Sequence, residues 1–286
     1  MPSDSHHRKS WHRIIPWVLL VLAAIAGPAS AQNATPPPGR SPTQTDVTVA
    51  IVLAVDTSGS VSNGRFELQK QGYAAAFRNP QVLNSIRSLA TQAIAVTMVQ
   101  WTGPRLHVVV VDWTLINDKT STEAFAAAIE AAPRQLFGGG TSISGAIDYS
   151  RILLAGMPFR PTRRIIDISG DGSNNSGRPV TQARDEAVAD GIGINGLPIL
   201  TVEPGLDHYY YENVIGGPGA FMIPAENYDT FADAILKKLI SEIAAAGPGT
   251  DHSFATSTAS QARPSLRQNL ATSVVPKSPR ATLARP

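Results

Sequence analysis

A long apolar run at residues 47–55 constrains the fold of this chain more than any other feature. Its residues are mostly β-branched or aliphatic. A strand of this kind is typically buried on both faces, as in parallel sheets that helices cover on both sides. The run leads directly into Asp56, within the sequence VDTSGSV at residues 55–61. The sequence therefore predicts a central strand that ends in a polar turn.

Strand and helix patterns alternate after this run. Further strands are predicted at 93–101, 106–113, 164–169, 194–202 and 220–223, with helices at 62–77, 122–132, 142–154, 180–189 and 228–246. Gly103-Pro104 indicates a hairpin, which makes one strand antiparallel at an edge of the sheet. Pro198 indicates a bulge or an irregular start in its strand. We therefore predict an α/β fold of three layers, a doubly wound and mostly parallel sheet with one antiparallel edge strand.

The N-terminal residues 1–31 have the pattern of a signal peptide. A basic segment contains Arg8, Lys9 and Arg13. An apolar stretch at 14–26 follows, and Ala29-Ser30-Ala31 forms a cleavage site. The stretch is too short for a stable membrane span, so we predict export to the periplasm or medium, with the mature chain starting near Gln32. The chain has no cysteine, which excludes disulfides and thiolate zinc sites.

Composition divides the remainder into three parts. Residues 32–45 are a predicted linker, 46–246 a single domain, and 247–286 a disordered basic tail rich in Pro, Ser, Ala and Thr. Residues 1–31 carry a net charge of +2 and the tail +4, whereas 32–246 carry −4. The basic character thus belongs to the ends of the chain and does not support nucleic-acid binding by the domain.

Three predicted loops at the carboxyl edge of the sheet carry oxygen donors beside glycines. The donors are Asp56, Ser58 and Ser60 in the first loop, Thr141 within GGGTS at 138–142, and Asp171 within SGDG at 169–172. Two carboxylates and three hydroxyls are hard ligands, which suit Mg²⁺ better than zinc or copper. Each element alone also has a structural interpretation, as a helix cap or a tight turn.

The three loops together resemble the von Willebrand factor A-type domain with a metal-ion-dependent adhesion site. That signature is Asp-x-Ser-x-Ser, a Gly-Thr loop and a Thr/Ser-x-Asp-Gly turn, and the resemblance covers about residues 46–246. It implies that Asp56, Ser58, Ser60, Thr141 and Asp171 bind Mg²⁺, or Mn²⁺ or Ca²⁺. It also implies a non-enzymatic, adhesion-type domain, whose metal captures an Asp or Glu carboxylate of a protein partner.

Two details refine the resemblance. The segment at 207–221 resembles an uncharacterised group of exported bacterial A-type proteins. Gly170 departs from the signature, because Thr or Asn often stands before the aspartate of the third loop. The sequence specifies neither the partner nor the oligomeric state.

Three other functions are compatible with parts of the pattern. The metal could stabilise a structural scaffold rather than bind a partner. A haloacid-dehalogenase-type phosphatase would use Asp56 as nucleophile and GDGSNN at 170–175 as its metal turn. That mechanism needs a second carboxylate where Ser58 stands, and no lysine lies between Lys119 and Lys237 to neutralise phosphate. A nucleotide-binding P-loop at 138–141 would lack its lysine.

Overall fold

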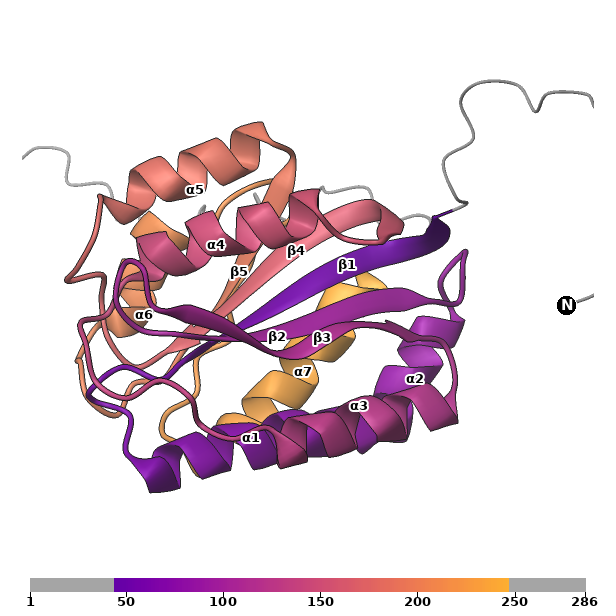
Figure 1. The fold of residues 1–286 in the computed structure, drawn as a ribbon, viewed down its shortest axis with the longest axis horizontal. Helices are drawn as coiled ribbons and strands as arrows, with labels where there is room; N and C mark the ends of the chain where they lie inside the picture. The colour runs from indigo at the N-terminus through magenta and orange to yellow at the C-terminus, as the bar shows by residue number, and fades with distance from the viewer. Residues whose placement is uncertain (1–43, 247–286) are drawn as a thin grey trace, which may run out of the picture. The chain divides into compact units, whose positions relative to one another are not determined.

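The computed structural model describes residues 44–246, which form a five-stranded sheet in the order β3-β2-β1-β4-β5 (Figure 1). The strands are β1 (Thr45–Asp56), β2 (Ile94–Trp101), β3 (His107–Ile116), β4 (Phe159–Gly170) and β5 (Ile192–Pro198). β1 pairs in parallel with β2 and β4, β4 in parallel with β5, and β3 pairs antiparallel with β2 at one edge. The predicted mostly parallel sheet with one antiparallel edge strand is therefore confirmed.

Helices cover both faces of the sheet. They are α1 (Asn63–Arg78), α2 (Pro80–Arg87), α3 (Lys119–Ala131), α4 (Ile143–Ala155), α5 (Val180–Ala189), α6 (Leu206–Tyr209), the π-helix Tyr210–Val214 and α7 (Phe231–Ala244). In Figure 1, α4 and α5 lie on one face, whereas α1, α2, α3 and α7 lie on the other. The carboxyl ends of the parallel strands meet at the left edge in that view, where the loops of the predicted site lie.

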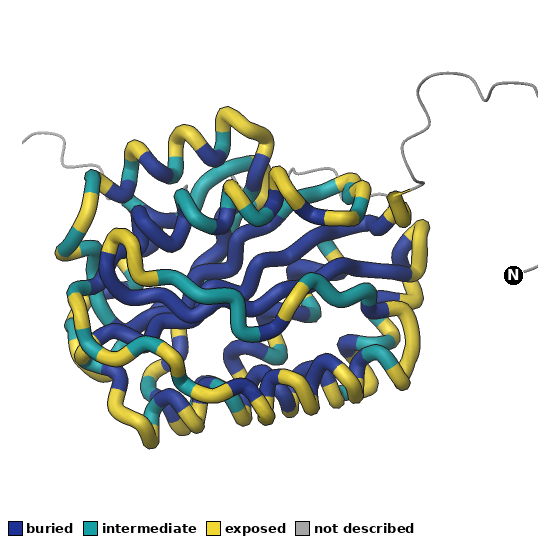
Figure 2. The backbone as a smooth tube through the Cα atoms, in the orientation of Figure 1, coloured by how far each residue is buried: buried dark blue, intermediate teal, exposed yellow. Residues whose placement is uncertain are grey.

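The central strand separates two apolar cores. Ile51 and Leu53 pack toward α1, α3 and α7, and Ala50 and Val52 pack toward α4 and α5. Figure 2 shows β1, β2 and β5 buried over almost their whole length, whereas β3 at the edge is mostly intermediate. Because successive side chains of a strand point to opposite faces, an unbroken apolar run supplies both cores at once.

The structure corrects some predicted elements. Residues 220–223 form no strand: Met222 makes only an isolated bridge to Gly196. β5 ends at Pro198 rather than continuing to residue 202. The Ile199 N–H still donates a hydrogen bond of 2.9 Å to Gly170 O, but β4 itself ends at Gly170, so the ladder has no further partner. The helix α2 was not predicted; Asn79 caps its first turn by accepting a hydrogen bond from Gln81 N at 2.9 Å, and Pro80 is its first residue.

A charged cluster joins α7 to the sheet. Lys238 Nζ lies 2.5 Å from Asp167 Oδ1 of β4 and 2.5 Å from Glu242 Oε1, with all three side chains fully buried. Asn195 of β5 donates a hydrogen bond of 2.8 Å to the same Glu242 oxygen. Burial, followed by the charge of Glu242, raises the pKa of Asp167 to about 7 against the opposing effect of Lys238. The cluster therefore holds one cation between two carboxylates.

Predictions for the two ends of the chain lie outside the described residues. These are the signal peptide 1–31, nearly all of the linker 32–45 and the tail 247–286. β1 begins at Thr45, one residue before the predicted start of the domain. Among residues 44–246, none of the helices combines the length and the apolar character that crossing a membrane requires.

Candidate functional site

The first loop leaves the sheet at the end of β1. Asp56 is the last residue of that strand and is fully buried, and Ser58 is almost fully buried. The Ser58 N–H donates a hydrogen bond of 2.7 Å to Asp56 Oδ1, which fixes the carboxylate against its own loop. The cap of α1 is Ser62. Asp56 and Ser58 therefore do not serve as the helix cap that the sequence also allowed.

The second loop places Thr141 immediately before α4. Thr102 donates hydrogen bonds to Gly138 O at 2.5 Å and to Gly140 O at 3.1 Å, so that the loop is held against the end of β2. Gly138 and Gly139 have φ values of 73° and 89°, in the left-handed region that glycine adopts without strain. Ser142 caps α4, which leaves the buried Thr141 side chain for another role.

The third loop begins directly after β4, with Asp171 fully buried. The hydroxyl of Ser60 donates a hydrogen bond to Asp171 Oδ1. Tyr228 donates one of 2.8 Å to Asp171 Oδ2, and Arg65 Nη1 lies 3.6 Å from the same oxygen. The carboxylate of Asp171 is thus held by groups from the first loop, from α1 and from the segment before α7.

These loops meet at one edge of the sheet. Ser58 Oγ lies 3.2 Å from Ser60 Oγ, which in turn bonds to Asp171. A β-carbon built at Gly59 would lie 3.6 Å from Gly139 O, and one at Gly172 would lie 3.6 Å from Thr141 Oγ1. The structure therefore brings the five predicted oxygen-bearing residues together from three separate parts of the chain.

Gly170, where the sequence departs from the signature, has a steric explanation. A β-carbon at this position would lie 3.0 Å from Asp56 Oδ2 and 3.0 Å from the hydroxyl of the buried Tyr210. Both contacts are closer than nearly all β-carbons make. In this chain Tyr210 occupies the space that a larger residue at 170 would need.

Burial dominates the electrostatics of the two carboxylates. It raises the pKa of Asp56 to about 7; the Ser58 N–H bond opposes the rise, and the charge of Asp171 adds to it. Burial, followed by the negative charge of Asp171, also raises the pKa of Tyr228 above its ordinary value, so that its hydroxyl stays a donor. The two buried carboxylates therefore make the site acidic, and Arg65 beside Asp171 offsets part of this charge.

The arrangement fits a hard divalent cation. Asp56 Oδ2 is buried and, within residues 44–246, has no hydrogen-bonding partner, which leaves one carboxylate oxygen available. No group of three His, Cys, Asp or Glu residues among the described residues could hold a metal by itself. Hydroxyl oxygens of Ser58, Ser60 and Thr141 would have to complete the ligand set. Such an oxygen-only set suits Mg²⁺, Mn²⁺ or Ca²⁺.

Sequence reasoning missed the residues that support the site. Tyr228 and Arg65 contact Asp171, and Glu203 Oε2 accepts a hydrogen bond of 2.7 Å from Ser173 N in the third loop. Arg65 lies five residues after Ser60, on the first turn of α1. The predicted helix could therefore have indicated that Arg65 lies close to the first loop. No local signal in the sequence links residue 228 to residue 171.

Residues 44–246 have the α/β fold of von Willebrand factor A-type domains. The chain belongs to the family described as "Protein of unknown function (DUF1194)", whose model matches residues 46–247. No curated protein matches this chain.

Solved structures with this fold come from distant proteins. One is proximal thread matrix protein 1 from the mussel byssus with a zinc-occupied MIDAS motif, at a TM-score of 0.52 and 13% identity over 69% of this chain and 46% of that one. Another is the vWF domain of the type V pili tip protein Mfa5 from Porphyromonas gingivalis, at a TM-score of 0.50 and 12% identity over 69% of this chain and 95% of that one. The match spans less than half of the mussel chain. At these identities the comparisons establish the fold alone.

Proposed function

We propose that this chain is an exported, non-enzymatic domain that binds a protein partner through a divalent cation. The metal ligands would be Asp56, Ser58, Ser60, Thr141 and Asp171, with Mg²⁺ as the resident ion or Mn²⁺ or Ca²⁺ in its place. The observation that carries the proposal is the meeting of three loops around a buried carboxylate oxygen without a partner among the described residues. Export rests on the signal-peptide pattern of residues 1–31.

The balance of charge supports a binding role for the metal. Two carboxylates balance a dication formally, but Asp171 already shares its charge with Tyr228 and Arg65. Neutral hydroxyls supply the other ligands. A cation held in this way would remain attractive to an incoming carboxylate from an Asp or Glu of the partner. Ser58, Ser60 and Thr141 would fix the position of the ion while the two aspartates hold its charge.

The comparisons support the same class of function without establishing it. One relative in fold is a pilus tip protein, and another is a matrix protein with zinc in its MIDAS motif. In this chain, the position two residues after Asp56 carries the Ser58 hydroxyl, which bonds to Ser60 and offers no carboxylic acid for phosphoryl transfer. We therefore favour binding over catalysis.

Calorimetric titration of Mg²⁺ and of Mn²⁺ into the purified chain, beside Asp56→Ala, tests the metal assignment. We expect heat of binding from the native protein and none from the variant, with both proteins equally folded by circular dichroism. Equal heats from the two proteins would refute the assignment.

A second measurement tests the open coordination position. Water bound to Mn²⁺ relaxes the bulk water signal, and glutarate that replaces this water would lower the relaxation rate. A fall in relaxation with glutarate, absent with neutral glutaramide, would support carboxylate capture. If metal binds but glutarate has no effect, and EDTA lowers the melting temperature strongly, the metal is structural and the domain is a scaffold.

A further inference from the structure

We propose that Asn174 and Asn175 are positioning residues that fasten the third loop to the second, so that Thr141 and Asp171 form one preorganised unit. The inference rests on the proposed function, because it concerns the same metal site. Neither asparagine is among the five predicted ligands, and both follow Asp171 within four residues.

Asn175 holds both backbone groups of Thr141 in place. The Thr141 N–H donates a hydrogen bond of 2.8 Å to Asn175 Oδ1, and the Asn175 N–H donates one of 2.9 Å to Thr141 O. The Ser176 N–H reaches the same carbonyl at 3.2 Å. The third loop provides hydrogen-bonding partners for both the N–H and the carbonyl of Thr141. The Thr141 hydroxyl is then the group that remains to bind the metal.

The second loop is shaped to admit this amide. A β-carbon at Gly140 would lie 2.9 Å from Asn175 Oδ1 and 2.9 Å from Ser176 Cβ. Any side chain at position 140 would therefore displace the asparagine. The close approach of the two loops therefore depends on glycine at position 140 and on asparagine at position 175.

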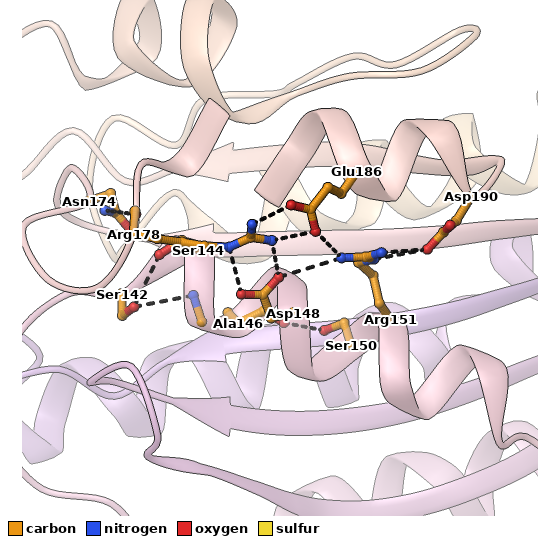
Figure 3. Close-up of polar contacts among 11 residues, drawn as sticks. Ser142, Ser144, Ala146, Asp148, Ser150, Arg151, Asn174, Arg178, Glu186 and Asp190 are labelled. Carbon is orange, nitrogen blue, oxygen red and sulfur yellow. Dashed lines mark hydrogen bonds and ion pairs between the residues drawn. The ribbon is translucent and has the colours of Figure 1, made fainter. Parts of the chain in front are cut away.

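Asn174 makes a second connection, in the first turn of α4. The Ser144 N–H, in that turn, donates a hydrogen bond of 2.9 Å to Asn174 Oδ1. Asn174 Nδ2 donates one of 3.2 Å to Arg178 O, as Figure 3 shows. The side chain thus ties the amino end of α4 to the far end of the third loop.

Arg178 anchors that far end on two helices. Its guanidinium bonds to both carboxylate oxygens of Asp148 on α4, at 3.0 and 2.6 Å, and to both oxygens of Glu186 on α5, at 2.5 and 2.9 Å. Figure 3 shows this network beside the first turn of α4. The third loop is therefore fixed at Asp171 by the site and at Arg178 by the helices, with the asparagines between them.

Asparagine suits this position for an electrostatic reason. The Asn174 amide donates and accepts at once, and it adds no charge near the two buried carboxylates of the site. A site whose ligands are already in place loses less conformational entropy when the ion binds. Removal of a supporting group outside the ligand set commonly weakens metal binding by about 10–100-fold.

The test compares Mn²⁺ affinity among variants of the full chain by calorimetry. Asn175→Leu has a similar volume but no acceptor, and we expect its affinity to fall by about 10–100-fold. Asn175→Asp keeps the acceptor and should bind Mn²⁺ more tightly than Asn175→Leu does. Asn79→Leu is the matched control, because its side chain accepts a hydrogen bond from Gln81 N at the start of α2, at the opposite end of the sheet from the three loops (Figure 1); we expect native affinity. Native affinity in Asn175→Leu would overturn the proposal.

Hydrogen exchange in the metal-free protein gives a readout independent of metal. Asn175→Leu should speed exchange at the Thr141 amide while the strands of the sheet stay protected. If Asn175→Leu does not fold, Asn174→Ala takes its place, with the same expectations for affinity and for the Ser144 amide. Unchanged exchange at these amides refutes the connection. If the native protein binds no Mn²⁺, the proposed function fails, and exchange alone decides whether the asparagines join the loops.

Discussion

Replacing Lys238 by methionine should destabilise the domain strongly and in a pH-dependent way. The ammonium lies 2.5 Å from a carboxylate oxygen of Asp167 and 2.5 Å from one of Glu242, and no part of the three side chains is exposed. Methionine fills a similar volume, so cavity formation contributes little. Removal of one partner from a buried ion pair costs about 3–5 kcal/mol, because the remaining charge is left uncompensated. We expect a loss in this range at pH 8.

The loss should be smaller at pH 5. Burial raises the pKa of Asp167, and Lys238 is the group that opposes this rise. Without the ammonium, Asp167 holds its proton to still higher pH. When the pKa of an acid is higher in the folded state than in the unfolded state, a rise in pH destabilises the folded state. The loss begins at the unfolded pKa, near 4, and is complete above the folded pKa. Tyr73 and Arg163 also face the cluster, but neither type of group titrates between pH 5 and 8.

Urea unfolding followed by circular dichroism, with EDTA and constant ionic strength, measures both effects. A matched control carries Asp167→Asn and Glu242→Gln together with Lys238→Met. It removes all three charges and should recover most of the lost stability. A loss below about 1 kcal/mol at pH 8, or an equal loss at both pH values, would refute the reasoning, because a desolvated ion pair cannot behave in that way.

Two further predictions concern the site. Gly170→Ala places a β-carbon 3.0 Å from Asp56 Oδ2 and should displace that carboxylate, which lowers Mn²⁺ affinity in calorimetry by about tenfold or more; native affinity would contradict the steric argument. Tyr228→Phe removes the 2.8 Å hydrogen bond to Asp171 Oδ2 and should weaken Mn²⁺ binding by about tenfold. An unchanged dissociation constant in Tyr228→Phe would mean that Asp171 needs no such support.

Sequence reasoning predicted most of the architecture because the main elements follow simple periodic patterns. The run at 47–55 became the central strand, and the Gly103-Pro104 hairpin gave the antiparallel edge strand. The prediction of a strand at 220–223 was wrong. This apolar segment lies beside β5 but makes only an isolated bridge to it, between Met222 and Gly196. Local pattern cannot distinguish these cases, since both bury apolar side chains against the sheet.

The five predicted ligands were found because each lies in a short sequence motif. The side chains that hold these ligands in place lie in no such motif. Tyr228 reaches Asp171 across 57 positions in the sequence, and its role depends on how the segment before α7 crosses the sheet edge. Asn175 was considered only as part of a phosphatase turn. Its bond to Thr141 spans 34 positions and could not be inferred before the second and third loops were placed side by side.

The charged cluster under α7 shows what sequence could have revealed. Spacing of Phe231, Ile235, Leu239 and Ile243 predicted the buried face of this helix, and all four are fully buried. Lys238 and Glu242 each directly precede one of these residues. Because charged side chains are usually exposed, polarity alone predicts that both face solvent. However, Asp167 stands inside the buried strand RIIDIS, and a carboxylate there requires a compensating cation. Lys237 and Lys238 of the closing helix are among the cations that a search for this partner would have tested.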